Sequence, residues 1–295
     1  MKLHTLSIIL AICFVSQQGF AQDSKPTNQN YQLLLQLLLP QYKPSENKVL
    51  VKHPYYTVFF DKEVKQARWV SHLVMPCECK LKRRGSFSED ENEGIKGFQV
   101  LKKTHYKPYN DSIKSIHGKK EYNLIYDVGH LAPYADFKWS LEAAKETNRF
   151  SNTAFQVASF NRWGWGPMEG RVRKYANKKQ KTLAVITGLY FGDYKFDGVS
   201  IKSRWVKGEQ VPTYFYKVLY DINSNQGIAL LMPNIANDKI KAYKKKQGKG
   251  LASFAKSIDE LEKILGIDFF ANLDDNLEAE FESKFDSENW KIIVK

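Results

Sequence analysis

Histidine and cysteine are both scarce in this sequence, and their scarcity limits the chemistry it can carry. Only 6 of the 295 residues are histidine and 3 are cysteine. Two cysteines stand together as Cys77-Glu78-Cys79, and no further cysteine or histidine follows at the spacing of a zinc motif. We interpret the pair as non-catalytic. A disulfide between them would close a very small ring, and their redox state stays open.

Long apolar runs are missing beyond the N-terminus. There, Lys2 precedes an apolar run over residues 6–15, and small and polar residues follow up to Ala21. This order is typical of a signal peptide, residues 1–21, and the run is too short to span a membrane. We expect cleavage after Ala21 and a secreted or periplasmic protein; a buried N-terminal helix is the alternative. Cys13 follows Ile12 instead of the small residue of a lipoprotein site, so we expect no membrane anchor.

Acidic residues are too few to balance the basic ones. Lys and Arg number 45 against 32 Asp and Glu, and loss of Lys2 with the signal peptide lowers the net charge from +13 to +12. Such an excess attracts and steers polyanions. Nucleic acid fits, as does an anionic membrane surface or polysaccharide. Three stretches gather the basic residues: 80–84, 171–181 and 239–249. We expect the acidic stretches 89–93 and 274–282 to lie away from a binding groove.

Hydrophobic patterning indicates an α+β fold. Residues 22–47 are interpreted as a linker and a short leucine-rich helix that Pro40 ends, and residues 48–295 as the main domain. β-branched and aromatic residues predict strands at 48–53, 56–60, 67–75, 181–191, 212–222 and 227–234. Helices are predicted at 140–150, capped by Ser140, and from the Ser257–Glu260 capping box to Gly266.

One of the few histidines lies in an unusual setting. Residues 126–140 read YDVGHLAPYADFKWS. We interpret Val128-Gly129 as a tight turn between two strands, which would hold His130 toward a cleft. A neutral imidazole there can accept a proton from water near pH 7. On its own, however, such a histidine is more often a structural residue.

A second group of polar residues follows downstream. Asn161, Trp165 and Glu169 are spaced i, i+4, i+8, so on a helix they share one stripe. Pro167 is tolerated only in a first helical turn, which predicts a helix that starts near Trp163 or Gly164 with Asn161 at its mouth. With His130, the group offers a base, an oxygen ligand for a hard cation and a carboxylate. The alternative is an ordinary helix with a buried Trp and a surface Glu.

These residues together resemble the DNA/RNA non-specific endonucleases, a family of the ββα-metal superfamily that includes secreted sugar-non-specific nucleases and mitochondrial endonuclease G. The matching segments are Asp127-x-Gly129-His130, Ser151-Asn152 with Gln156, Phe160-Asn161-Arg162, and Trp165 with Glu169. Upstream, Arg83-Arg84 with Phe87 and Asp90 is similar to the family's Arg–aromatic–Asp signature; downstream, Thr187-Gly188 and SIDELEKILGIDFF match too. The resemblance covers roughly residues 48–282, in fixed order.

The resemblance implies a fold and a set of roles. The fold would be a central, mostly antiparallel β-sheet with flanking helices and a ββα-metal motif in an endonuclease domain at 48–295. His130 would be the general base, and Asn161 the direct protein ligand of one Mg²⁺ or Mn²⁺. Glu169 would hold metal-bound water, and Arg83 or Arg84 would contact phosphate. Supporting roles would fall to Asp127, Asn152, Gln156 and Trp165. DNA, and RNA with it, would be the substrate, cut with little sequence preference.

Two departures from the family pattern leave alternatives open. Val128 stands where the family has arginine, which removes one cation beside the base. The stretch 163–167 replaces a more helical one. The chain could therefore be a relative that lost catalysis and only binds nucleic acid or another polyanion. A phosphodiesterase acting on small or lipid-linked diesters is the third hypothesis.

Overall fold

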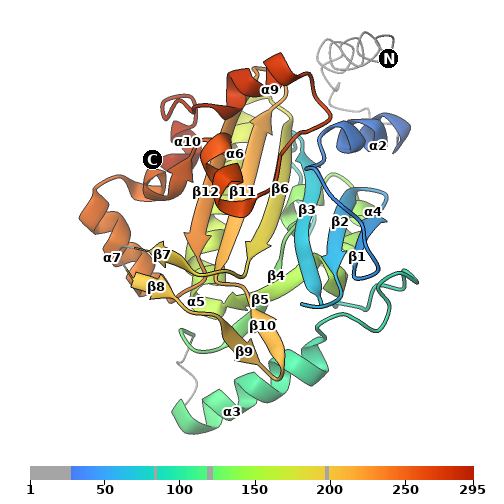
Figure 1. The fold of residues 1–295 in the computed structure, drawn as a ribbon, viewed down its shortest axis with the longest axis vertical. Helices are drawn as coiled ribbons and strands as arrows, with labels where there is room; N and C mark the ends of the chain where they lie inside the picture. The colour runs from blue at the N-terminus through green and yellow to red at the C-terminus, as the bar shows by residue number, and fades with distance from the viewer. Residues whose placement is uncertain (1–27, 83–84, 118–121, 197–198) are drawn as a thin grey trace.

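The computed structural model describes residues 28–82, 85–117, 122–196 and 199–295 (Figure 1). The predicted signal peptide and the arginine pair 83–84 lie outside these ranges. Cleavage after Ala21 and phosphate contact by an arginine therefore stay predictions. In the described ranges, no helix combines the length and apolar character needed to cross a bilayer.

Seven antiparallel strands form the central sheet, as predicted (Figure 1). Their order across the sheet is β1 (Lys48–Lys52), β2 (Tyr56–Asp61), β3 (Gln66–Val74), β6 (Leu183–Tyr190), β11 (Tyr214–Asp221), β12 (Gln226–Pro233) and β13 (Ala255–Lys256). The near-continuous apolar run of β6 takes the middle position because both of its faces are buried. The predicted hairpin of β11 and β12 is also present, in the register Tyr220–Gly227.

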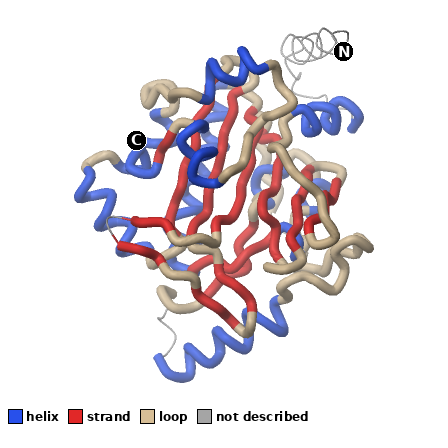
Figure 2. Tube along the Cα trace, viewed as in Figure 1, coloured by secondary structure: helices blue, strands red, loops and turns tan. Residues whose placement is uncertain are grey.

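Alternation along the strands divides the core between two faces. In β6, Leu183 and Val185 join one hydrophobic cluster while Ala184 and Ile186 join the other. This follows from the two-residue period of a strand. The helices α4 (Leu141–Glu146), α6 (Gly166–Lys179), α7 (Asn237–Gln247) and α10 (Lys291–Val294) contribute to the first cluster. The helices α2 (Asn28–Leu37), α8 (Ile258–Leu265) and α9 (Asp275–Glu282) contribute to the second. Figure 2 shows these helices and the sheet between them.

Three short hairpins and several single turns complete the fold. The hairpins join β4 (Tyr126–His130) to β5 (Thr153–Val157), β7 (Tyr194–Phe196) to β8 (Val199–Ile201), and β9 (Arg204–Val206) to β10 (Glu209–Val211). The remaining helices are α3 (Lys107–His117) and the three-residue α5 (Ala158–Phe160). Single 3₁₀ turns are η2 (Tyr134–Phe137), η3 (Phe150–Asn152) and η5 (Gly250–Phe254); π-helical turns are η1 (Lys102–Tyr106) and η4 (Asn161–Trp165).

Local capping signals place two helix starts correctly. Ser140 accepts a hydrogen bond from the Ala143 N–H at the start of α4, and Ser257 and Glu260 form the predicted capping box of α8. Gly266 ends α8 in the left-handed conformation, with φ of 65°. The end of α4, however, comes at Glu146 and not at residue 150. The chain turns extended there, and the Phe150 N–H donates to the Ser88 carbonyl in a distant loop.

Candidate active site

His130 lies at the end of β4, in a hairpin that packs on the α6 face of the sheet. β4 pairs with β5, placing Asp127 opposite Gln156 and His130 opposite Thr153. The predicted turn at Val128-Gly129 is therefore wrong, since both residues lie inside the strand. Gly129 is required for a different reason: a Cβ there would approach Gln156 Oε1 to 2.3 Å. The glycine makes room for the buried Gln156 side chain.

The His130 ring is held by two residues from other parts of the chain. Its Nε2 lies 3.2 Å from Asn148 Oδ1, and its ring centroid lies 4.7 Å from that of Phe87. When Nε2 carries the proton and donates to Asn148, Nδ1 carries the lone pair that a general base needs. Asn148 was missed by the sequence analysis, although it stands only three residues before Ser151-Asn152. The aromatic residue of the upstream signature does reach the histidine.

Asn152 fastens the two segments that carry His130 and Asn148. Its side-chain amide donates to the Ala132 and Thr147 carbonyls, each at 2.8 Å, and its Oδ1 accepts from the Ala132 N–H at 2.8 Å. Asn152 is fully buried, and all three of these side-chain hydrogen bonds go to the backbone. The base and its partner are thus held on a fixed frame.

Asp127 forms an ion pair with an arginine from the helical run that carries Asn161. The Arg162 guanidinium forms a bidentate ion pair with the Asp127 carboxylate, with Nε–Oδ2 at 2.8 Å and Nη2–Oδ1 at 2.6 Å. Asn161 Nδ2 also donates to Asp127 Oδ2, at 2.9 Å. The carboxylate therefore fixes the Asn161 amide through its nitrogen. The amide oxygen, which is the atom that binds hard cations, is then on the other side of the group.

The helix that carries Asn161 begins earlier than predicted. Helical backbone runs from α5 through η4 into α6 without a break, so Asn161 lies inside the helical run and not at its mouth. Proline is accommodated because η4 is a π-helical turn, in which the Gly166 N–H donates to the Asn161 carbonyl five residues back. The wider turn relieves the clash that Pro167 would otherwise cause. It also breaks the regular spacing that the predicted stripe assumed.

Glu169, one turn into α6, belongs to a group of charges between the helix and the sheet. Burial raises its pKa to about 7, which the nearby Lys217 ammonium opposes and the Asp136 carboxylate reinforces. Asp136 is fixed by Arg173 Nη1 at 2.7 Å and by His72 Nε2 at 2.9 Å. Positive and negative side chains therefore alternate around Glu169, so that each charge has an opposite charge nearby, as is usual for charges taken out of water.

Lys217 is the buried cation of this group and comes from the middle of β11. Its side chain is only 1% exposed, and its Nζ donates to Thr187 Oγ1. The ammonium also lies 5.3 Å from the centroid of the buried Trp165 ring, within cation–π range. Burial lowers the Lys217 pKa, while Glu169 and Asp136 oppose that shift. A lysine in an otherwise apolar strand was the sequence signal for this contact.

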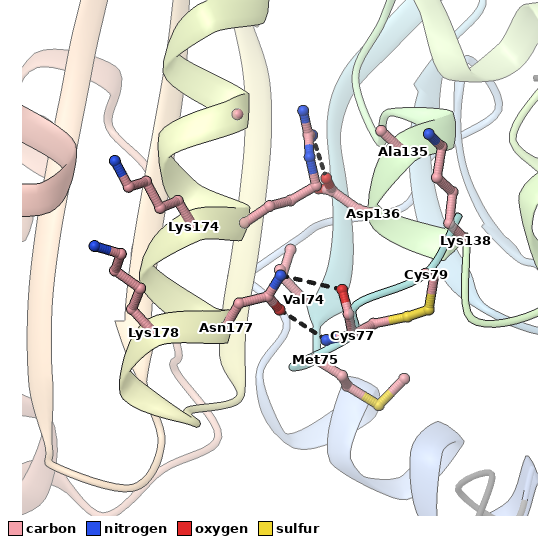
Figure 3. A pocket seen from close by; sticks show the side chains of 12 residues that line it. Val74, Met75, Cys77, Cys79, Ala135, Asp136, Lys138, Lys174, Asn177 and Lys178 are labelled. Carbon is pink, nitrogen blue, oxygen red and sulfur yellow. Dashed lines mark hydrogen bonds and ion pairs between the residues drawn. A yellow bond between two sulfur atoms is a disulfide. The ribbon is translucent and has the colours of Figure 1, made fainter. Parts of the chain in front are cut away.

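A polar cavity of about 390 Å³ lies beside this group, next to α6 (Figure 3). Lys138, Arg173, Lys174 and Lys178 contribute basic side chains to its lining. Cys77 and Cys79, which also line it, are joined in a disulfide. Asn177 Oδ1 accepts from the Cys77 N–H at 2.7 Å and its Nδ2 donates to the Cys77 carbonyl at 3.1 Å, so the disulfide loop is anchored to α6.

Direct contacts among the described residues connect part of the predicted site. Asp127 contacts Asn161 directly and pairs with Gln156 across the hairpin. Both polar atoms of the Gln156 amide are buried without a hydrogen-bond partner among the described residues. Glu169 instead has its contacts in the Lys217 group. The arginine pair 83–84, which we predicted to contact phosphate, falls outside the described ranges.

The donor set fits a metal that binds few protein groups. In the described ranges, the three His, Cys or carboxylate side chains close enough to hold an ion as a group lie elsewhere, in α8 and α9. An ion here would therefore rest on the Asn161 amide oxygen, with water and substrate oxygens completing its shell. Proteins commonly bind Mg²⁺ in this way, because the ion keeps several of its waters.

The solved structure of an EndoG/EndoGI complex has a similar fold. The alignment has a TM-score of 0.60 and 22% sequence identity, and covers 85% of this chain and 95% of that chain. A salivary endonuclease of Lutzomyia longipalpis is 28% identical over 65% of this chain and 47% of its own length. Mitochondrial endonuclease G of Bos taurus is 26% identical over 74% of this chain and 68% of its own length. The matched part of this chain thus spans from about half to about two thirds of the length of these two relatives.

The family model for DNA/RNA non-specific endonucleases matches residues 36–276. That range includes the β4–β5 hairpin, the helical run from α5 to α6 and the whole α8 segment. The match agrees with the resemblance found in the sequence and with the mixed fold around an antiparallel sheet. The chain therefore belongs to the DNA/RNA non-specific endonuclease family.

Proposed function

We propose that the chain is an exported, metal-dependent endonuclease that hydrolyses phosphodiester bonds of DNA and RNA with little sequence preference. One observation supports this most strongly. The same hairpin strand carries His130, held by Asn148, and Asp127, held by Arg162 and fixing the Asn161 amide. A base on this strand and a hard-cation ligand, Asn161, that the same strand holds through Asp127 suit phosphodiester hydrolysis.

In the proposed mechanism, His130 takes a proton from the attacking water at Nδ1, while Asn148 keeps the ring oriented through Nε2. Asn161 Oδ1 would hold Mg²⁺ or Mn²⁺. When bound, the ion supplies positive charge to the phosphoryl oxygens and to the departing alkoxide. Glu169 would accept a hydrogen bond from a water bound to that ion. Arg83 or Arg84 contacts the phosphate.

Nucleic acid is the proposed substrate because the charge and the exposed aromatic groups near the site both suit it. Trp163 is 50% exposed two residues after Asn161, and its ring meets Tyr122 edge-on at 5.4 Å. Arg162 lies over the Tyr122 ring at 4.8 Å. Aromatic side chains stack on bases of any sequence, and cations bind the phosphates. The basic lining beside α6 extends this surface.

Export is proposed from the N-terminal pattern, with residues 1–21 removed as a signal peptide. Residues 22–47 would then form a linker and the helix α2, and residues 48–295 the endonuclease domain. The disulfide of Cys77 and Cys79 suits an oxidising compartment. The similar salivary endonuclease also carries a name that fits secretion.

Digestion of plasmid DNA and of RNA by the mature protein tests the proposal. With Mg²⁺ or Mn²⁺ we expect both substrates to be cut, and EDTA to stop the reaction. His130→Ala should lower kcat about 10²- to 10⁴-fold, the usual contribution of a general base. The matched control is His105→Gln, a histidine that contacts Glu209 and the Leu101 backbone instead.

Two outcomes would contradict the proposal. Wild-type protein that binds DNA without ever nicking it would favour the binding-protein hypothesis. Cleavage that survives EDTA would remove the metal from the mechanism.

A further inference from the structure

The far face of the sheet carries a group of carboxylates that the nuclease site does not use. Asp259 and Glu262 come from α8, and Glu282 is the last residue of α9. One carboxylate oxygen of each lies within 4.8 Å of the others. These helices pack on the second hydrophobic cluster, whereas His130 and α6 lie on the first face. The group is therefore separated from the candidate active site by the sheet.

Packing of α8 and α9 over a glycine brings these side chains together. A Cβ at Gly227 in β12 would lie 2.7 Å from Ile258 Cδ1 and 2.9 Å from Phe281 Cδ2. The missing side chain lets both helices approach the same point of the sheet. Asp259 and Glu262 are three residues apart and share one side of α8. Glu282 directly follows Phe281 and is carried to the same place.

Glu282 is the side chain that lacks a partner. It is only 4% exposed, and its Oε1 has no hydrogen-bond partner among the described residues. Glu278 Oε1, one turn earlier, is likewise buried without a partner in the described ranges. Burying a carboxylate without compensation is costly, so such groups are paired, protonated or bound to a metal. Within the described part of the chain, the side chains that act on the pKa of Glu282 are all carboxylates.

The charges that act most strongly on Glu282 are other carboxylates. Burial, as the largest cause, raises its pKa to about 10 together with the nearby carboxylates of Glu262, Glu278, Asp259 and Asp268. Burial and neighbouring acids also raise the Glu278 pKa, to about 7. Among these acids, Glu262 is held in place, since its Oε1 accepts from the Phe269 N–H at 2.7 Å. The arrangement concentrates negative charge in a fixed position.

We propose that Asp259, Glu262 and Glu282 bind a divalent cation, Ca²⁺, that fastens α9 to α8. Only oxygen ligands face the site, which excludes the nitrogen and sulfur sets that zinc prefers. Three carboxylates on two helices suit the larger and more flexible shell of Ca²⁺ better than the strict octahedron of Mg²⁺. Water and Glu278 complete the coordination. The ion compensates the buried charge of Glu282 and holds the C-terminal helices on the sheet.

Thermal unfolding of the full mature protein tests this site without any measurement of nuclease activity. After removal of metals with EDTA, excess Ca²⁺ should raise the Tm of the wild type by about 5 °C, as expected for a ligand far above its Kd. Glu282→Gln should lose this rise, while remaining at least as stable as the wild type in EDTA, because the amide is neutral without the proton that the buried Glu282 carboxyl must take up when no cation is bound. Calorimetric titration with Ca²⁺ should show at least a tenfold loss of affinity for the same variant.

Two controls decide where the ion binds. Glu280→Gln changes an exposed residue of the same helix, which accepts from Asn225, and should keep the full Ca²⁺ effect. Asn161→Ala alters the candidate active site and should keep it as well. No rise in wild-type Tm, or an equal rise in Glu282→Gln, would overturn the proposal. A rise lost in Asn161→Ala but kept in Glu282→Gln would assign the ion to the other face.

Discussion

At the scale of single residues, the chemistry around His130 depends on small side chains and amides. The sequence motif singled out His130, Asn161 and Glu169 with Asp127 and Asn152 in support, but not every residue that orients them. Asn148 contacts the His130 ring, and Arg162 pairs with Asp127. Neither could be recognised from spacing, since a side chain's direction depends on the tertiary fold. Asp127, beside Val128, is thus paired with a cation from another element.

Gly129 allows a direct test of the close packing behind the base. Gly129→Ala should destabilise the protein by about 1–3 kcal/mol, the usual cost of an overpacked core, because its Cβ would approach Gln156 Oε1 to 2.3 Å. Urea denaturation measures the change. Gly170→Ala in α6 is the matched control, where the nearest atom lies at 3.7 Å and stability should rise by up to about 1 kcal/mol. Equal stability of Gly129→Ala and wild type would contradict this account of the glycine.

At the scale of elements, α6 and the sheet are joined by buried charges as well as by apolar contacts. Met168 and Val172 pack into the first cluster, while Glu169 and Arg173 on the same helix reach Lys217 and Asp136. Capping boxes and strand patterns were readable in the sequence because they depend on near neighbours. The π-helical turn before α6 was not, because it arises where Pro167 meets an already formed helix.

Lys217 is the residue on which this junction depends. Lys217→Met should destabilise the protein by about 3 kcal/mol, because it leaves Glu169 and Asp136 buried with less compensation. The double variant Lys217→Met with Glu169→Gln should recover part of that loss. Chemical denaturation of the wild type, both single variants and the double variant gives the coupling energy. Strictly additive effects would show that the two charges are independent.

At the scale of the whole molecule, the excess of basic residues should govern association with nucleic acid. The sequence carries a net charge of +13, and the cavity beside α6 is lined by Lys174, Lys178 and other cations. The acidic residues of α9 are gathered on the other face of the sheet. This distribution agrees with the expectation that the stretch 274–282 lies away from the groove.

Salt dependence of DNA binding checks this distribution, measured with His130→Ala so that the DNA stays intact. Affinity should fall about 10³-fold or more between roughly 50 and 200 mM salt, through release of counterions. Replacing Lys174 and Lys178 by Gln should reduce the slope of log K against log salt by about 2. The control Lys263→Gln, on α8, should leave the slope unchanged. A wild-type affinity that hardly responds to salt would argue against phosphate contacts.

The sequence by itself determined the fold class, most strand positions, the helix caps, the excess of positive charge and the three residues of the family motif. The first four of these features rest on local periodicity, local capping and composition, which do not require the chain to be folded, whereas the motif residues were identified by their resemblance to the family. Tertiary structure alone decided that Asn148 reaches His130, that Arg162 pairs with Asp127, and that Glu282 is buried among other acids. Such contacts join elements far apart in sequence, and their partners are selected by strand order and by how closely the helices can approach the sheet.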